Sequence, residues 1–93
     1  MITINVLLTV KPEHEQTYLT FLNDLVQKSR ADQGCLFYDH FRSVQQPNSY
    51  IIVENWADDE SITAHNETEH LKAFFTTVPP LLQSEPILNI SRS

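Results

Sequence analysis

Residues 34–65 read GCLFYDHFRSVQQPNSYIIVENWADDESITAH, and this stretch decides the fold. Two parts of it, residues 35–42 and 50–56, are rich in aromatic and β-branched residues, which is typical of strands. The connection between them contains Pro47-Asn48, and such residues mark turns. The stretch therefore predicts two antiparallel strands joined by a hairpin.

Upstream of the hairpin, the chain predicts one strand and one helix. Residues 2–10 are apolar and β-branched, with Ile2, Ile4, Val6, Leu8 and Val10 on one side of the pleat. Pro12 suits the first position of a helix, where its missing N–H is tolerated. One apolar stripe then follows helical spacing until the turn at residues 32–34, and it consists of Tyr18, Phe21, Leu22, Leu25 and Val26.

Downstream of the hairpin, the chain predicts a second helical region and a last strand. Asp58 or Asp59 can cap the start of a helix. Residues 61–69 are polar enough to indicate a short helix with a kink near Thr68. A second apolar stripe follows before Pro79-Pro80, and it consists of Leu71, Phe74, Phe75 and Val78. The segment 86–90 is typical of an edge strand.

The predicted order β-α-β-β-α-β is that of the α+β, ferredoxin-like split βαβ fold, in which both helices cover one face of an antiparallel sheet. Ninety-three residues allow one domain, residues 1–93. Apolar residues occur on both sides of the strands, so two helices cannot cover them all. Packing of the sheet against a second copy would cover the rest, and we therefore expect a homodimer.

Composition excludes several classes of function. A net charge of −6 repels phosphate backbones and anionic lipid headgroups, so we expect neither nucleic-acid nor membrane binding. The first residues lack a basic start and a long apolar run, which predicts a cytoplasmic protein. The lone Cys35 is expected to be a buried apolar group. The lone Gly34 excludes a dinucleotide fingerprint and a P-loop, so no motif for a redox cofactor is present.

The order of motifs resembles the antibiotic biosynthesis monooxygenase family. The motifs are the turn Gly34-Cys35-Leu36, the pair Arg42-Ser43, the segment Glu54-x-Trp56 and His65 in the following helix. Members of this family are small dimeric α/β barrels, and some oxidise quinols or anthrones without metal or flavin. The resemblance implies an apolar aromatic substrate held between the sheet and the helices. Proton abstraction would make it electron-rich enough to react directly with dioxygen.

The same resemblance implies roles for seven residues. His65 is the expected catalytic base, because the pKa of imidazole lies near neutrality. Tyr38 and Asn5 are expected to be catalytic hydrogen-bond donors to a substrate oxygen or oxyanion. The expected substrate-binding residues are Trp56, as an aromatic wall, and His40, Glu54 and Phe74. For Glu54 a structural ion pair with Arg42 is the favoured alternative.

Other functions stay open at this point. Asn5 and Trp56 also resemble two members of a haem-binding triad in relatives that degrade haem, although neither His65 nor His70 clearly matches the haem-ligating position. An isomerase or a phospho-sugar signal-degrading enzyme of the same fold would use the same proton-transfer group without oxygen. A third alternative is a non-catalytic, stress-related dimer.

A metal site is not expected from the sequence. His65 and His70 are five residues apart, which on one continuous helix points them about 140° away from each other. Asp39 and His40 lie on opposite faces of their strand because side chains alternate.

Overall fold

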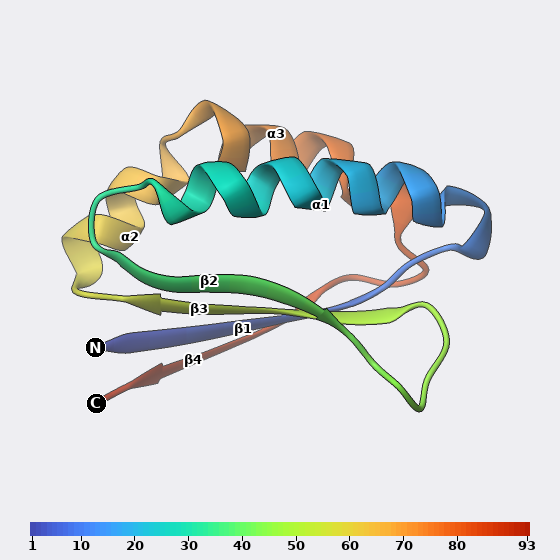
Figure 1. The fold of residues 1–93 in the computed structure, drawn as a ribbon, viewed down its shortest axis with the longest axis horizontal. Coiled ribbons are helices and arrows are strands. Elements are labelled where there is room, and N and C mark those ends of the chain that lie inside the picture. Colours follow the sequence, from blue (N-terminus) through green and yellow to red (C-terminus); the bar gives the residue numbers. More distant parts are fainter.

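The computed structural model describes residues 1–93 and has the expected α+β architecture (Figure 1). The elements in chain order are β1 (Ile2–Thr9), the 3-10 helix η1 (Pro12–His14), α1 (Glu15–Arg30), β2 (Cys35–Arg42), β3 (Ser49–Trp56), α2 (Asp59–Asn66), α3 (Glu69–Thr77), the 3-10 helix η2 (Pro79–Leu81) and β4 (Ile87–Arg92). The predicted ferredoxin-like order of strands and helices is confirmed.

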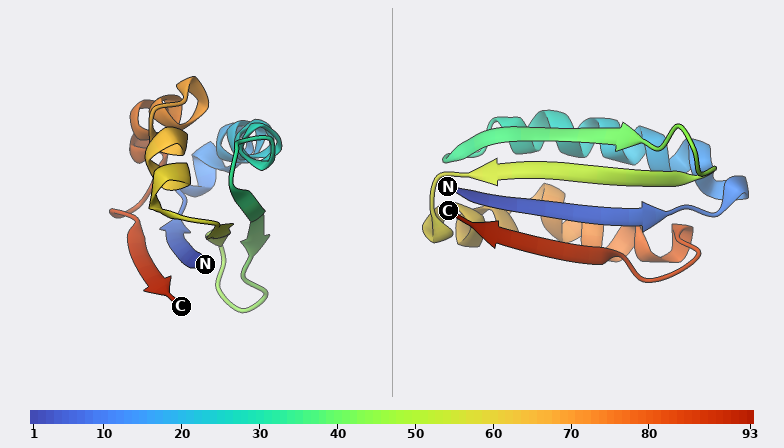
Figure 2. Two further views of the ribbon diagram at one scale, coloured as in Figure 1. Left: turned by 90° about the vertical axis from the view of Figure 1, so that its left-hand side faces the viewer. Right: turned by 90° about the horizontal axis from the view of Figure 1, so that it is seen from below.

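The four strands form one antiparallel sheet in the order β2-β3-β1-β4. All three α-helices lie on the same face of this sheet, and the opposite face is bare (Figure 2). The register places Ile4 of β1 opposite Glu54 of β3, and Glu54 opposite Tyr38 of β2. Directly opposed residues share a face, so these three side chains all point toward the helices.

The core lies between the sheet and the helices, and alternation in the strands decides its members. In β1 the buried residues are Ile2, Ile4, Val6 and Leu8, as predicted. In β3 they are Tyr50, Ile52, Glu54 and Trp56. The α1 stripe is buried at Tyr18, Leu22, Leu25 and Val26, while Phe21 is half-buried.

The ends of several elements differ slightly from the prediction. β1 ends at Thr9, and Val10 forms an isolated bridge to Leu82. Pro12 begins a short 3-10 helix, and the α-helix proper starts at Glu15. Asp58 caps α2 by accepting a hydrogen bond from the backbone N–H of Ser61 at 2.8 Å.

The predicted interruption near Thr68 is confirmed, since α2 ends at Asn66 and α3 begins at Glu69. The Thr68 hydroxyl accepts a hydrogen bond from the backbone N–H of Leu71 and donates one to the carbonyl of His65 at 2.7 Å. One side chain thus ends one helix and caps the next.

Gly34 fixes the distance between the turn after α1 and the start of α2. Its φ of +82° lies in the left-handed region that favours glycine. A Cβ at this position would lie 1.8 Å from Oγ of Ser61. The absence of a side chain therefore lets α2 approach the turn that also carries Asp32.

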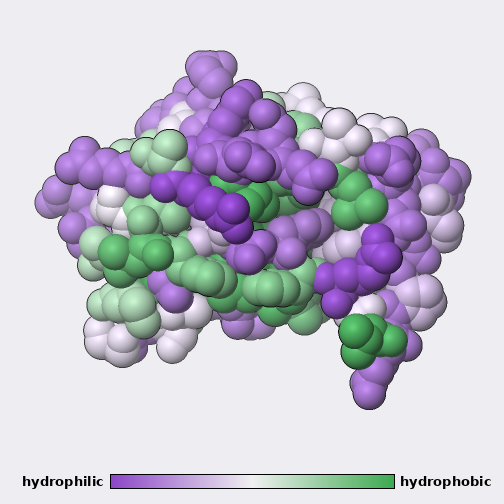
Figure 3. All heavy atoms as spheres, in the orientation of Figure 1, coloured by the Kyte–Doolittle hydropathy of each residue, from purple (hydrophilic) through white to green (hydrophobic).

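The bare face of the sheet carries large apolar residues. Leu7, Phe37, Phe41 and Ile87 point to this face and are each 38% or more exposed. Figure 3 shows that the helical layer is mostly hydrophilic and that hydrophobic residues gather along the sheet. None of the helices combines the length and apolar character needed to cross a membrane.

Candidate active site

A cavity of about 340 Å³ lies between the helix-covered face of the sheet and helices α2 and α3. Its volume falls within the range of small-molecule sites, and its wall is mostly apolar. The wall consists of Ile4, Val6, Tyr38, Ile52, Glu54, Ile62, His65, Asn66, Leu71, Phe74, Phe75, Pro86, Leu88 and Ile90. Four of the seven predicted site residues are among them: Tyr38, Glu54, His65 and Phe74.

His65 is one of the residues of this wall, and one of its two ring nitrogens is buried and unpaired. It lies in the last turn of α2 and is 3% exposed. Its Nδ1 lies 2.7 Å from Oδ2 of Asp32. An ionised carboxylate only accepts hydrogen bonds, so Nδ1 carries the hydrogen and Nε2 keeps its lone pair. Nε2 is buried and has no hydrogen-bond partner in the protein.

The surroundings of His65 favour the neutral ring. Burial lowers the pKa of His65 below its usual value near 6.5, and the hydrogen bond and charge of Asp32 partly oppose this. The imidazole is therefore neutral at pH 7. A neutral imidazole with a free lone pair is the form that a general base requires.

His70 meets the same carboxylate, which corrects the expectation that the two histidines diverge. Nε2 of His70 lies 2.8 Å from Oδ2 of Asp32, the oxygen that also binds His65. The 140° separation applied to one continuous helix, whereas the break at Thr68 starts a new helix in another direction. The kink was predictable, and its consequence for His70 followed only from the structure.

Asp32, His65 and His70 are residue types that bind metal ions, so the distances among them matter. Their donor atoms lie within 4.8 Å of one another. Both short distances run to a single Asp32 oxygen, at 2.7 and 2.8 Å, which is hydrogen-bond geometry. The contacts in the structure are therefore those of two N–H donors on one carboxylate.

Glu54 and Trp56 form a buried pair beside the cavity. The indole Nε1–H of Trp56 donates to Oε1 of Glu54 at 2.8 Å. Burial raises the pKa of Glu54 to about 7, although the Trp56 hydrogen bond opposes the rise. The favoured pairing of Glu54 with Arg42 is wrong, because the Arg42 guanidinium lies over the ring of Tyr50 instead.

Trp56 packs against the wall residue His65 and is not itself part of the cavity wall. It is fully buried, and its ring centroid lies 4.5 Å from that of His65. Tyr38 lines the cavity with its ring centroid 5.7 Å from that of His65. Burial, followed by the Glu54 charge, raises the pKa of the Tyr38 phenol well above its usual value. Tyr38 is therefore a neutral hydroxyl at pH 7.

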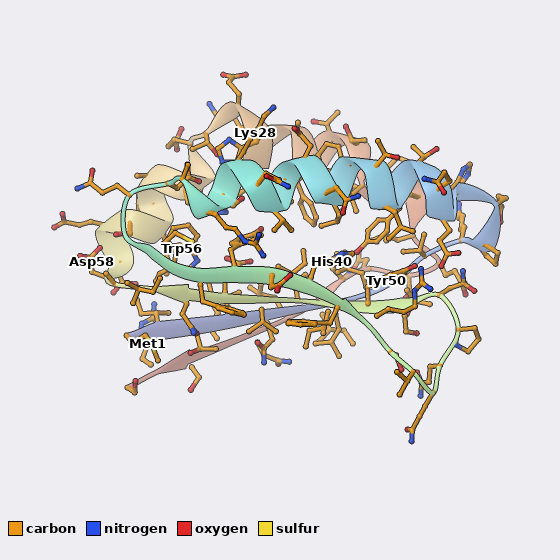
Figure 4. All side chains as sticks on the ribbon, in the orientation of Figure 1. Met1, Lys28, His40, Tyr50, Trp56 and Asp58 are labelled. Carbon is orange, nitrogen blue, oxygen red and sulfur yellow. The ribbon has the colours of Figure 1, made fainter.

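His40 lies in a separate, packed cluster at the other end of the sheet. Its Nε2 is hydrogen-bonded to the Tyr18 hydroxyl at 2.8 Å, and its ring stacks on Tyr50 at a centroid distance of 5.1 Å. Figure 4 shows Trp56 near the end of the sheet where α2 lies, and His40 and Tyr50 farther along beneath α1. The structure does not bring His40 to the cavity.

Asn5 lies on the bare face of the sheet, opposite Val53 of β3 and Asn89 of β4. Trp56 lies on the helix-covered face with its β1 partner Ile2. Asn5 and Trp56 are therefore separated by the sheet. The pair that suggested haem binding does not converge in one site.

Two residues of the site escaped the sequence analysis, Asp32 and His70. Asp32 was assigned only to a turn, and it lies 33 residues from His65 in the chain. The one visible signal is that this acidic residue lies two positions before the only glycine. Its partners become evident only when α2 packs over that turn.

The fold and the cavity define a class of small ferredoxin-like proteins with an apolar pocket and a buried imidazole on its wall. The chain belongs to the antibiotic biosynthesis monooxygenase family, whose sequence model matches residues 1–77.

One curated relative supports this assignment, and two solved structures share the fold. A Bacillus subtilis (strain 168) protein named "Putative monooxygenase YcnE" is 36% identical over 84 residues, which are 90% of this chain and 88% of the relative. The structure of PA3566 from Pseudomonas aeruginosa has a TM-score of 0.90 at 29% identity, covering 99% of this chain and 92% of that one. A crystal structure described as an antibiotic biosynthesis monooxygenase has a TM-score of 0.93 at 24% identity, covering 100% and 98%.

Proposed function

We propose that this chain is a cofactor-independent monooxygenase of small aromatic, quinol-like compounds, with His65 as its base. One observation carries the proposal. The Nε2 atom of His65 is buried and unpartnered, while Nδ1 is held by the Asp32 carboxylate, and the ring lines an apolar cavity. A buried polar atom without a partner calls for an explanation, and a substrate proton that it accepts would provide one.

The chemistry needs one proton acceptor and dioxygen. Nε2 of His65 takes a proton from the substrate, and the resulting anion is electron-rich enough to reduce dioxygen to a carbon-bound peroxide. Cleavage of the O–O bond leaves one oxygen on the substrate. The other oxygen leaves as water with two hydrogens, one returned by His65 and one lost from the substrate carbon that carries the peroxide. The substrate is oxidised, dioxygen is reduced, and no external reductant is required.

Three further cavity residues have roles in this proposal. The neutral hydroxyl of Tyr38 donates a hydrogen bond to the anionic oxygen of the substrate. Glu54 has a pKa raised to about 7, so near neutral pH a fraction of it is protonated and also donates. Phe74 and its apolar neighbours bind the aromatic ring. Asn5 has no part in this site because it lies on the opposite face of the sheet.

An oxygen-labelling experiment tests the proposed reaction. Protein treated with EDTA and free of flavin absorbance would be supplied with a panel of hydroquinones and anthrones under ¹⁸O₂. We expect oxygen uptake with one labelled oxygen atom per product and no release of hydrogen peroxide. Absence of uptake with every compound, or hydrogen peroxide with an unlabelled product, would refute the proposal. A proton-transfer product formed without oxygen would favour the isomerase alternative.

The proposed enzyme is a homodimer that buries the bare sheet face. Leu7, Phe41 and Ile87 expose apolar surface there, and Ile51 and Val53 lie half-buried between them. Such a contiguous apolar face is unusual on a monomer. Analytical ultracentrifugation should show a dimer, and Phe41→Glu should dissociate it. Val44→Glu is the matched control, because Val44 is 99% exposed in the β2–β3 hairpin. A wild-type chain that sediments as a monomer would contradict the dimer.

A further inference from the structure

A chain of three side chains connects the cavity with the opposite surface of the helical layer. His65 forms part of the cavity wall, and His70 lines a separate hollow between α1 and α3. Asp32 lies between the two rings and contacts both through Oδ2, at 2.7 Å from His65 and 2.8 Å from His70. The side chain of His65 is 3% exposed, whereas Asp32 and His70 are 16% and 15% exposed.

The hydrogen bonds fix which atoms carry hydrogens. The Asp32 carboxylate accepts and does not donate, so Nδ1 of His65 and Nε2 of His70 are both N–H donors. Two donors on one oxygen hold the carboxylate in a single orientation. Because Nδ1 of His65 is the donor, its lone pair is confined to Nε2.

We propose that Asp32 and His70 are positioning residues for the base: Asp32, held by His70 from the α1–α3 hollow, fixes the Nδ1–H tautomer of His65. Asp32 also stabilises the imidazolium that forms when Nε2 accepts the substrate proton. The inference rests on the proposed function for the identity of the reaction, and the tautomer itself does not depend on any substrate.

In other enzymes a carboxylate orients a catalytic imidazole by the same hydrogen bond to Nδ1–H. The added element here is a second histidine, which does not touch the substrate cavity and acts only on the carboxylate. Three separate segments supply the members: the turn after α1, the end of α2 and the first turn of α3. The Thr68 interruption and the Gly34 turn, described above, bring these segments together.

The direct test is nitrogen NMR of the histidine rings in the wild-type protein without substrate. The ¹⁵N chemical shifts distinguish a ring nitrogen that carries hydrogen from one that does not. We expect His65 to be neutral at pH 7.5, with hydrogen on Nδ1 and none on Nε2. Asp32→Asn should leave His65 as a mixture of tautomers. A wild-type His65 with hydrogen on Nε2 would overturn the inference.

Variants of the two positioning residues give a kinetic test. Asp32→Asn keeps the shape of the side chain but removes its charge, and we expect kcat to fall on the order of 100-fold with KM nearly unchanged. His70→Leu should lower kcat about tenfold, while His70→Gln should restore it because the Gln amide N–H replaces Nε2–H. The matched control is His14→Gln, since His14 is a half-buried histidine in η1. Equal losses in His70→Leu and His70→Gln would overturn the role of His70.

Two outcomes distinguish a failure of this inference from a failure of the proposed function. The Nδ1–H tautomer without any oxygen uptake would refute the proposed reaction and leave the positioning arrangement standing. Oxygen uptake with hydrogen on Nε2 of His65 would support an oxygenase reaction, but it would refute both the Nδ1–H tautomer and Nε2 as the proton acceptor. Titration with zinc chloride tests the metal alternative: micromolar binding that removes the Nδ1 hydrogen and is lost in Asp32→Asn would overturn the inference.

Discussion

Two histidines on the same side of the sheet have opposite surroundings. His40 is packed between Tyr18 and Tyr50, with Nε2 hydrogen-bonded to the Tyr18 hydroxyl at 2.8 Å. His65 contacts Trp56 and Tyr38 in a similar aromatic environment, yet its Nε2 has no partner and the ring borders a cavity. Residue type and burial therefore do not distinguish the proposed base from the packed histidine. The two differ in that His65 has an unpaired Nε2 and belongs to the wall of a cavity.

The sharpest test of this difference compares the two histidines by substitution. His65→Gln should lower turnover about 1,000-fold, because general-base catalysis contributes about 10² to 10⁴ in rate. His40→Gln should leave turnover within about threefold. Steady-state oxygen uptake measures both, with circular dichroism as the check that each variant is folded. Equal effects of the two substitutions would show that the packed His40 and the cavity-lining His65 do not differ in function.

Gly34→Ala should destabilise the packing of α2 against the turn after α1, and this packing supports the cavity. The new Cβ would lie 1.8 Å from Oγ and 2.4 Å from Cβ of Ser61, and its φ of +82° is unfavourable for alanine. Left-handed backbone and overpacking together cost about 3 kcal/mol in the free energy of unfolding. Urea denaturation measures this, and Ser61→Gly should recover part of the loss in the alanine background. No recovery would mean that the contact with Ser61 is not the cause.

His40 and Glu54 should make opposite contributions to the pH dependence of stability. Burial lowers the pKa of His40 to about 4 from its usual value near 6.5. Between these values the unfolded chain binds a proton that folded His40 does not, so stability falls as the pH falls. The loss should be about 2 kcal/mol, less than the full shift because His40 keeps some solvent contact. Denaturation between pH 4 and 7 should show a shallower slope for His40→Gln.

Glu54, in the cavity wall, gives the dependence of stability on pH the opposite sign. Its folded pKa is raised to about 7 from 4.5. Between these values the folded chain holds a proton that the unfolded chain releases, so stability falls as the pH rises. Glu54→Gln should remove this part of the pH dependence in the same denaturation series. If the slope survives the substitution, Glu54 is ionised in the folded protein.

The smallest effects should come from two tyrosine hydroxyls. Tyr18→Phe removes the hydrogen bond to His40 and should destabilise the protein by about 1 kcal/mol. Tyr38→Phe should change stability by less than about 0.5 kcal/mol, because the Tyr38 hydroxyl lies near the Ser29 hydroxyl without a well-formed hydrogen bond between them. Its effect should appear as a lower kcat, because the hydroxyl that stabilises the substrate anion is lost. Thermal unfolding and kcat measured on both variants would separate the roles, and a larger stability loss for Tyr38→Phe would contradict the comparison.

Periodicity in the sequence was enough to predict the fold. Alternation in residues 2–10 and the stripe in α1 reflect burial on one face, which depends only on local spacing. The structure places Tyr38 and His65 on the cavity wall, while their roles in catalysis stay predictions. Strand register was not visible in the sequence, and register decides that Asn5 lies on the bare face. Contacts between residues far apart in the sequence, such as Asp32 and His65, could likewise not be predicted from local patterns.

The break at Thr68 changes how the spacing of the two histidines should be interpreted in other sequences. Because a new helix begins there, the angular relation between positions 65 and 70 comes from a capping residue and not from helical pitch. A count of residues between histidines therefore misleads unless the cap is included. His-x-x-Thr-x-His, preceded by an acidic residue two places before a turn glycine, is a pattern by which this shared carboxylate can be recognised without coordinates.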